Sequence, residues 1–145
     1  MEIYTIGFAQ RTAENFFGTL KRVGIRRLID VRLNNTSQLA GFAKARDLPF
    51  FLRELCNAGY FYEPLLSPSK TILDAYKKEK GSWEEYKQQF LALMARRKIE
   101  EKISQKLFDV PTVLLCSEAT ASHCHRRLVL EYLQEKWGGI EIIHL

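Results

Sequence analysis

Short apolar runs alternate with segments of helical periodicity along this chain, and this alternation constrains its fold more than any other feature. The apolar runs fall at residues 3–6, 27–31, 60–63, 112–116 and 141–144. They are typical of buried strands because they are brief, rich in aliphatic residues and bounded by glycine or polar residues. The pattern predicts a single three-layer α/β domain over residues 1–145, with a mainly parallel sheet of four to five strands flanked by helices.

Cap and stop residues indicate where the helices between these strands begin and end. The predicted starts are Thr12, Asp47 and Ser82, and the predicted ends are Gly24 and Gly59. Ser82 is followed three residues later by Glu85, which is a capping-box signature. A last helix is expected to open at residues 124–127 and to continue through 128–137. Residues 32–45 and the stretch that holds Pro64 and Pro68 are predicted to be irregular.

The composition narrows the environment and the partners. A net charge of +5 mildly favours anionic partners such as phosphates or nucleic acid. No apolar run approaches the roughly 20 residues that span a bilayer, and the chain begins with a strand rather than a signal-like segment. We therefore expect a cytoplasmic protein without membrane contact or cofactor. In that reducing compartment the three cysteines are expected to be free thiols, ligands or core residues instead of disulfides.

Polar or reactive side chains follow three of the predicted strands. They are residues 7–11, Asp30 with Arg32, and Cys116 with Glu118. In an open parallel sheet, ligands bind beyond the carboxyl ends of the strands. The sequence therefore predicts one composite site to which all three strand ends contribute.

The segment from Cys116 to Arg126 holds most of the reactive side chains. Its loop of small residues can turn N–H groups inward to bind an anion, and the helix that follows adds partial positive charge. The same field would favour the thiolate of a nearby cysteine. The candidate catalytic residues are Cys116, Glu118, Cys124 and His125, and the candidate substrate-binding residues are Asp30, Arg32 and Arg126.

Each candidate also has a purely structural interpretation. Both cysteines can be packing residues, and His125 can bind a backbone carbonyl. Glu118 can form an ion pair with Arg126, and Asp30 can form a self-contained pair with Arg32 that fixes the following loop.

Metal binding is a distinct option, in which Cys116, Cys124 and His125 with His123 or Cys56 would supply thiolate and imidazole ligands. Two features argue against it: the sequence has no CxxC pair, and neighbouring Cys124 and His125 are expected to point in different directions on a helix. We therefore predict no metal.

Three motifs carry a family resemblance: Tyr4-Thr5-Ile6-Gly7, Leu28-Ile29-Asp30-Val31-Arg32, and C-x-E-x5-C-H-R from Cys116 to Arg126. Together they resemble the family called domain of unknown function 488, over nearly the whole chain. The resemblance implies a compact α/β domain whose shared site residues are Asp30, Arg32, Cys116, Glu118, Cys124, His125 and Arg126. Many members have a histidine where this chain has Phe8. There is also a looser likeness to rhodanese and cysteine-phosphatase domains, but the C-x5-R spacing of the phosphatases is absent.

These observations lead to two hypotheses about the function, and the two belong to different classes of protein. The first is an enzyme acting on a phosphate-bearing or other anionic substrate, such as a nucleotide or nucleic acid. In it Arg32 and Arg126 anchor the anion, Glu118 or His125 transfers protons, and a cysteine supplies a nucleophile.

The alternative is a non-catalytic nucleic-acid-binding or regulatory module. It would use the positive side chains Lys44, Arg46, Arg126 and Arg127. A third interpretation is a buried polar network that only stabilises the fold. Open sheet edges are compatible with a homodimer.

Overall fold

Five strands form one parallel sheet in the computed structural model, which describes residues 1–145. They are β1 (Glu2–Gly7), β2 (Arg27–Asp30), β3 (Gly59–Tyr62), β4 (Thr112–Cys116) and β5 (Glu141–His144). Their order in the sheet is β3-β2-β4-β1-β5, and all four neighbouring pairs are parallel. The predicted α/β fold with a parallel sheet is confirmed.

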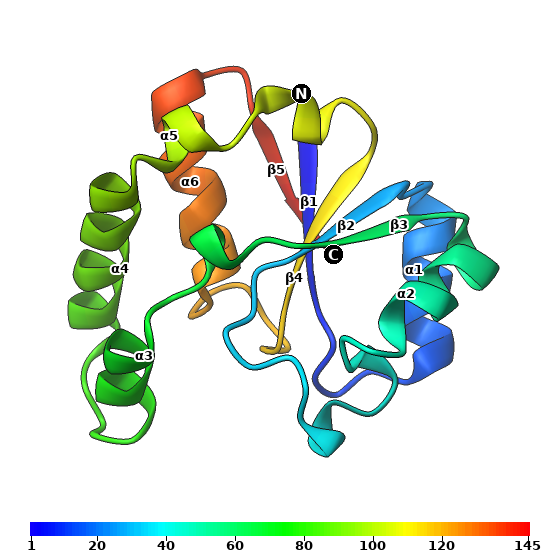
Figure 1. Ribbon diagram of the computed structural model, residues 1–145, viewed down its shortest axis with the longest axis horizontal. Helices are drawn as coiled ribbons and strands as arrows, with labels where there is room; N and C mark the ends of the chain where they lie inside the picture. Colours follow the sequence, from blue (N-terminus) through cyan, green and yellow to red (C-terminus); the bar gives the residue numbers. More distant parts are fainter.

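Helices cover both faces of this sheet (Figure 1). One face packs against α1 (Ala13–Val23), α2 (Leu48–Phe51) and the π-helical turn η2 (Leu52–Cys56). The other face packs against α3 (Lys70–Lys77), α4 (Trp83–Arg97), α5 (Ile99–Lys102) and α6 (His125–Trp137). Three short 3-10 turns complete the chain: η1 (Gln38–Ala43), η3 (Pro64–Leu66) and η4 (Gln105–Phe108).

The central strand β4 is buried along its whole length and supplies both halves of the core. Side chains alternate between the two faces of a strand. Val113 and Leu115 pack on the α1 side, while Leu114 and Cys116 pack on the α6 side. The alternation of side chains along β4 therefore places Cys116 on the face of the sheet that α6 and its neighbouring helices cover.

Several helix boundaries follow the predicted cap chemistry. The side chain of Thr12 accepts a hydrogen bond from the backbone N–H of Asn15 at the start of α1. Gly24 ends that helix with a φ of 83°, a left-handed conformation that glycine adopts without steric cost. Ser82 caps α4 by accepting from the N–H of Glu85.

The helix predicted to start at Asp47 does begin there, although the Asp47 side chain makes no cap bond. Two other predicted features of the middle of the chain are wrong. The turn after α2 ends at left-handed Asn57, whereas Gly59 already belongs to β3. The stretch after Pro68 is not irregular, because Ser69 caps α3. α3 and α4 then pack together through their aromatic side chains, at a distance of 4.8 Å between the rings of Tyr76 and Tyr86.

The connections after β1 and β4 leave the sheet toward opposite faces. α1 follows β1 on one face and α6 follows β4 on the other, although these two strands are neighbours (Figure 1). In the register of this pair Gly7 lies opposite Cys116. Such a switch point leaves a crevice at the carboxyl ends of the strands, where ligands of parallel α/β proteins bind. The fold thus positions the predicted site at the crevice.

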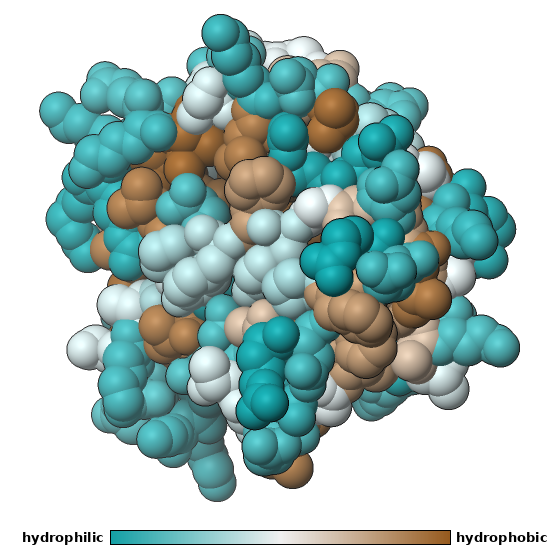
Figure 2. Space-filling view, turned by 45° about the vertical axis from the view of Figure 1, so that its right-hand side comes forward, coloured by the Kyte–Doolittle hydropathy of each residue, from teal (hydrophilic) through white to brown (hydrophobic).

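The two outer strands, β3 and β5, leave both edges of the sheet open. On β3, Phe61 and Tyr62 are each 45% exposed. On the face shown in Figure 2, hydrophobic residues form separate groups between hydrophilic ones. None of the helices combines the length and the apolar character that crossing a membrane requires.

Candidate functional site

A cavity of about 160 Å³ lies where the segments after β2 and β4 meet α3 and α4. A cavity of about 150 Å³ holds a molecule the size of benzene, so this one suits one small molecule or one group of a larger molecule. The polar and sulfur-bearing residues that line it are Arg32, Asn34, Tyr76, Lys77, Tyr86, Cys116, Ser117, Glu118, His123, Cys124 and His125. Two of the three strand ends predicted to converge, those of β2 and β4, contribute residues to this lining, whereas residues 7–11 after β1 do not.

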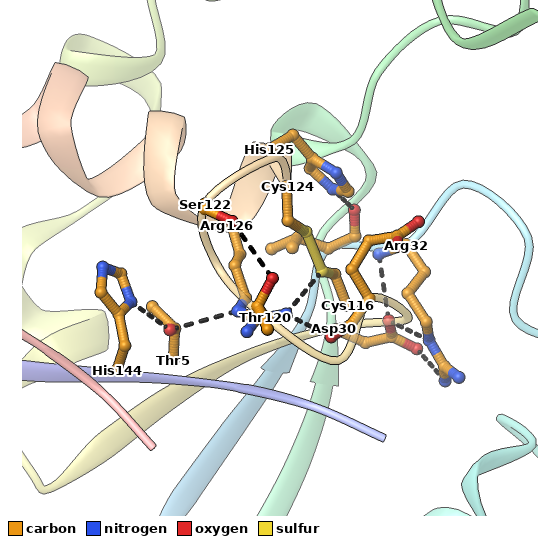
Figure 3. The surroundings of a disulfide bond; sticks show 12 residues. Thr5, Asp30, Arg32, Cys116, Thr120, Ser122, Cys124, His125, Arg126 and His144 are labelled. Carbon is orange, nitrogen blue, oxygen red and sulfur yellow. Dashed lines mark hydrogen bonds and ion pairs between the residues drawn. A yellow bond between two sulfur atoms is a disulfide. The ribbon is translucent and has the colours of Figure 1, made fainter. Parts of the chain in front are cut away.

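Cys116 and Cys124 are joined in a disulfide at the wall of this cavity (Figure 3). Cys124 is the N-cap residue of α6 and has an extended backbone, which turns its side chain back toward the end of β4. The expectation that all cysteines are unpaired is wrong for these two. It is confirmed for Cys56, a half-buried free thiol that donates to the carbonyl of Phe17.

Arg126 is fully buried immediately behind this disulfide. Its Nη1 lies 3.1 Å from Sγ of Cys116 and donates to the carbonyl oxygen of Glu118, while its Nε donates to the hydroxyl of Thr5 (Figure 3). Burial lowers the pKa of Arg126 to about 10, and the charge of Arg11 acts in the same direction. The guanidinium therefore stays charged at neutral pH.

The predicted ion pair between Glu118 and Arg126 does not form. The Glu118 carboxylate instead accepts a bond of 2.6 Å from Nζ of Lys77, and only its backbone carbonyl faces Arg126. No carboxylate lies within 4.0 Å of the buried guanidinium, and Arg126 is not part of the cavity lining. A direct contact of Arg126 with substrate stays a prediction, and its position favours action through Cys116.

Gly7 makes room for this arrangement. A Cβ atom at this position would lie 1.6 Å from the carbonyl oxygen of Glu118 and 2.7 Å from Nη1 of Arg126. Any side chain at residue 7 would therefore displace the loop that follows Cys116.

Asp30 and Arg32 form an ion pair with each other, as their structural interpretation predicted. Oδ1 and Oδ2 of buried Asp30 accept from Nε and Nη2 of Arg32, each at 2.8 Å, and Oδ2 also accepts from Tyr60 at 2.6 Å. Burial alone would raise the pKa of Asp30, but these bonds and the charge of Arg32 lower it overall. Asp30 thus positions Arg32.

Arg32 keeps one unused donor. Its side chain is 2% exposed and lines the cavity, and its Nη1 is buried without a hydrogen-bond partner. The guanidinium also lies 5.4 Å from the ring centre of Phe8. Phe8 therefore packs against a residue of the site. This is the position at which the resemblance described above leads one to expect histidine.

His125 binds a backbone carbonyl, as its structural interpretation predicted. Its Nε2 lies 2.6 Å from the carbonyl oxygen of Val31, which can only accept, so Nε2 carries the proton. Burial lowers the pKa of His125 to about 4 despite this bond. The ring is therefore neutral at physiological pH, with Nδ1 as its free lone pair.

The ligand atoms of Cys116, Cys124 and His125 all lie within 4.8 Å of one another. The argument that Cys124 and His125 point apart is therefore wrong. It assumed that both residues are helical, whereas Cys124 precedes the first turn of α6.

Sequence reasoning missed Lys77, Tyr76 and Tyr86, because it did not predict α3 and gave the helix that starts after Ser82 no part in the site. Lys77 is the one lysine of the cavity and binds Glu118. The spacing of Ile72, Leu73 and Tyr76 after Ser69 was the available signal for this helix.

The four basic residues assigned to a nucleic-acid surface do not form one patch. Arg126 is buried, Arg127 pairs with Glu131, and Lys44 binds Gln38. Only Arg46 is largely exposed, at 84%.

The fold and site define a parallel α/β protein with paired cysteines at the switch point of its sheet. Residues 12–133 match the family model described as Domain of unknown function DUF488, and the chain belongs to this family. The match includes Asp30 and the segment from Cys116 to Arg126, but it begins after Gly7 and Phe8. No curated protein and no solved structure matches the chain.

Proposed function

We propose that this protein is a thiol-dependent enzyme that acts on a small anion or on an anionic group of a larger substrate. Cys116 is its reactive sulfur. One observation carries the proposal: a fully buried arginine without a carboxylate partner donates to the sulfur of a cysteine that lines a cavity.

The charge of Arg126 explains why this contact matters. An ion buried without a partner of opposite charge is costly, and a cation close to a thiol favours the thiolate. When the disulfide is open, the thiolate of Cys116 is the anion best placed to balance Arg126. The thiolate is also the form that acts as a nucleophile.

The charges around the cavity favour an anionic substrate. Arg32 and Lys77 both line it, and Nη1 of Arg32 has no partner of its own. Lys77 is tied to Glu118, but both side chains are about half exposed, so a substrate anion can exchange with this pair. Arg32 and Lys77 are thus the proposed anchors, and Glu118 is the proposed acid or base.

The disulfide must open before Cys116 can react. A cellular dithiol supplies the two electrons: it exchanges with the bond between Cys116 and Cys124, becomes a disulfide itself, and leaves two thiols in the protein. Such a step suits a reducing compartment, and we propose the cytoplasm. The thiolate of Cys116 then attacks an electrophilic atom of the substrate, forms a bond to it and displaces the leaving group.

A pair of alkylating reagents tests this proposal on the reduced protein. Iodoacetate and iodoacetamide are alike in size but differ in charge, and ordinary thiolates react faster with the neutral amide. We expect Cys116 to prefer iodoacetate, with Cys56 in the same chain showing the ordinary preference. Lys77→Gln should weaken the preference of Cys116 and leave Cys56 unchanged.

The readout is mass spectrometry of the peptides that contain each cysteine. If Cys116 reacts no faster than Cys56, the assignment of Cys116 as the nucleophile is wrong. If Cys116 shows the ordinary preference for iodoacetamide, the proposed specificity for anions is wrong.

No observation favours the two other predictions, a nucleic-acid-binding module and a homodimer, and both stay predictions.

A further inference from the structure

We infer that the reduced protein binds a soft divalent cation, with zinc as the first choice, through Cys116, Cys124 and His125. The three ligand atoms are buried and lie within 4.8 Å of one another. Thiolate and imidazole are the ligands that zinc prefers. The inference concerns the same cysteines as the proposed function but does not rest on it, because metal binding requires no nucleophilic step.

The distances leave little to rearrange. Zinc binds sulfur at about 2.3 Å and nitrogen at about 2.0 Å, so tetrahedral geometry needs roughly 3.8 Å between two sulfurs and roughly 3.6 Å between sulfur and nitrogen. The ligand atoms reach this spacing by shifts of an ångström or two once the disulfide opens. The Cα atoms of Cys116 and Cys124 are 7.5 Å apart, above the 4.4–6.8 Å usual for disulfides. This backbone spacing leaves room for an atom between the sulfurs.

The surroundings resemble the outer shell of a metal site. The bond from Nε2 of His125 to the carbonyl of Val31 leaves Nδ1 as the lone pair. Ligand histidines typically donate their other ring nitrogen to a carbonyl or carboxylate in this way. Arg126 adds a donor to the sulfur of Cys116.

The charges predict an open fourth position. Two thiolates neutralise the divalent ion, which leaves the positive charge of Arg126. An anion arriving from the cavity would balance it, whether hydroxide or part of a substrate. Three protein ligands with an open position are typical of catalytic rather than structural zinc sites.

Metal binding and the disulfide are alternative states of the same two sulfurs. A low-molecular-weight disulfide can oxidise the zinc-bound pair: the two thiolates lose two electrons and form the S–S bond, the small disulfide becomes two thiolates, and zinc is released. Opening the bond with a dithiol restores the metal site.

Titration of the reduced, full-length protein with zinc tests the inference, in competition with a chromophoric chelator and under anaerobic conditions. We expect one equivalent of zinc to bind. Cobalt in its place should give thiolate-to-cobalt charge-transfer absorption in the near ultraviolet. Cys116→Ser, Cys124→Ser and His125→Gln should each lose more than the roughly 10–100-fold in affinity that removal of an outer-shell partner costs. Cys56→Ser is the matched control and should bind as the wild type does.

A second readout uses the wild-type protein alone, so that it does not depend on the folding of a variant. Zinc should protect Cys116 and Cys124, but not Cys56, from alkylation, and the disulfide form should bind no zinc. Failure of the reduced protein to bind zinc, or unchanged alkylation of both site cysteines with zinc bound, would overturn the inference. Alkylation of the metal-free protein tests the nucleophile separately, so the two proposals can fail independently.

Discussion

At the scale of single residues, His125 links the site to the stability of the protein. Its pKa is lowered to about 4 by burial, whereas an unfolded histidine has a pKa of about 6.5. Between these values the unfolded state binds more protons than the folded state. The resulting stability is fully present above about pH 6.5 and is lost as the pH falls toward 4.

We predict that the free energy of unfolding of the disulfide form falls by about 3 kcal/mol more between pH 6.5 and 4 in the wild type than in His125→Gln. Glutamine can still donate to the carbonyl of Val31 but does not titrate. His144, whose pKa burial also lowers, contributes equally to both proteins. Urea unfolding at several pH values measures the difference. Parallel pH profiles for the two proteins would show that His125 is not a buried neutral ring.

The sequence predicted which residues form the site better than it predicted their partners. Arg32, Cys116, Glu118, Cys124 and His125 line the cavity, whereas Asp30 and Arg126 lie behind it, bonded to Arg32 and Cys116. The partner of Glu118 could not be predicted, because Lys77 lies 41 positions away on a helix that the sequence did not reveal. Contacts between separate elements depend on how those elements pack.

At the scale of elements, the close approach of β1 to the loop after β4 shapes the site. Ala9 donates to the carbonyl of Ser117, and Gly7 leaves the space that the carbonyl of Glu118 and the guanidinium of Arg126 occupy. The site thus needs a residue without a side chain at the end of β1.

Gly7→Ala should destabilise the protein by about 1–3 kcal/mol or more, because the new methyl group must displace backbone. Gly18→Ala is the matched control. Nothing lies within 4 Å of a Cβ at this position in α1, and alanine should stabilise that helix by about 0.5–1 kcal/mol. Thermal unfolding of both variants measures the contrast. Equal stability of Gly7→Ala and the wild type would contradict the packing described for the loop.

Strands were easier to predict than helices in this chain. The short aliphatic runs of β1, β2 and β4, bounded by glycine or polar residues, match the pattern of buried strands, and a parallel sheet with helices on both faces requires strands of this kind. α3 was missed because Pro64 and Pro68 suggested an irregular stretch, and the helix that begins after Ser69 carries only a short apolar pattern. The helix after Asp47 begins where the sequence predicted, although a suitable cap residue does not ensure a cap bond.

At the scale of the whole molecule, the disulfide ties the central strand to α6. The bonded cysteines are 8 residues apart in the sequence. Closing so short a loop restricts the unfolded chain by about 2.5 kcal/mol in the chain-entropy model. The state of this one bond therefore affects the global stability.

Opening the disulfide should lower the free energy of unfolding of the metal-free protein by about 2–3 kcal/mol. Denaturant unfolding with and without a phosphine reductant measures the change. Cys56→Ser should show the same difference, because its thiol takes no part in the bond. A reduced protein as stable as the oxidised one would contradict this contribution.

The central claim, that Arg126 holds Cys116 as a thiolate, is tested most directly by the pH dependence of the alkylation rate of Cys116 in the reduced, metal-free protein. We predict a midpoint below about 8.5, the value for a free cysteine. Arg126→Gln should raise this midpoint by about 1–3 units, whereas Arg126→Lys, which keeps the charge, should raise it less. Arg127→Gln, at the neighbouring partly exposed arginine, should leave it unchanged. A wild-type midpoint at or above 8.5, or the same midpoint in the wild type and in folded Arg126→Gln, would contradict the account.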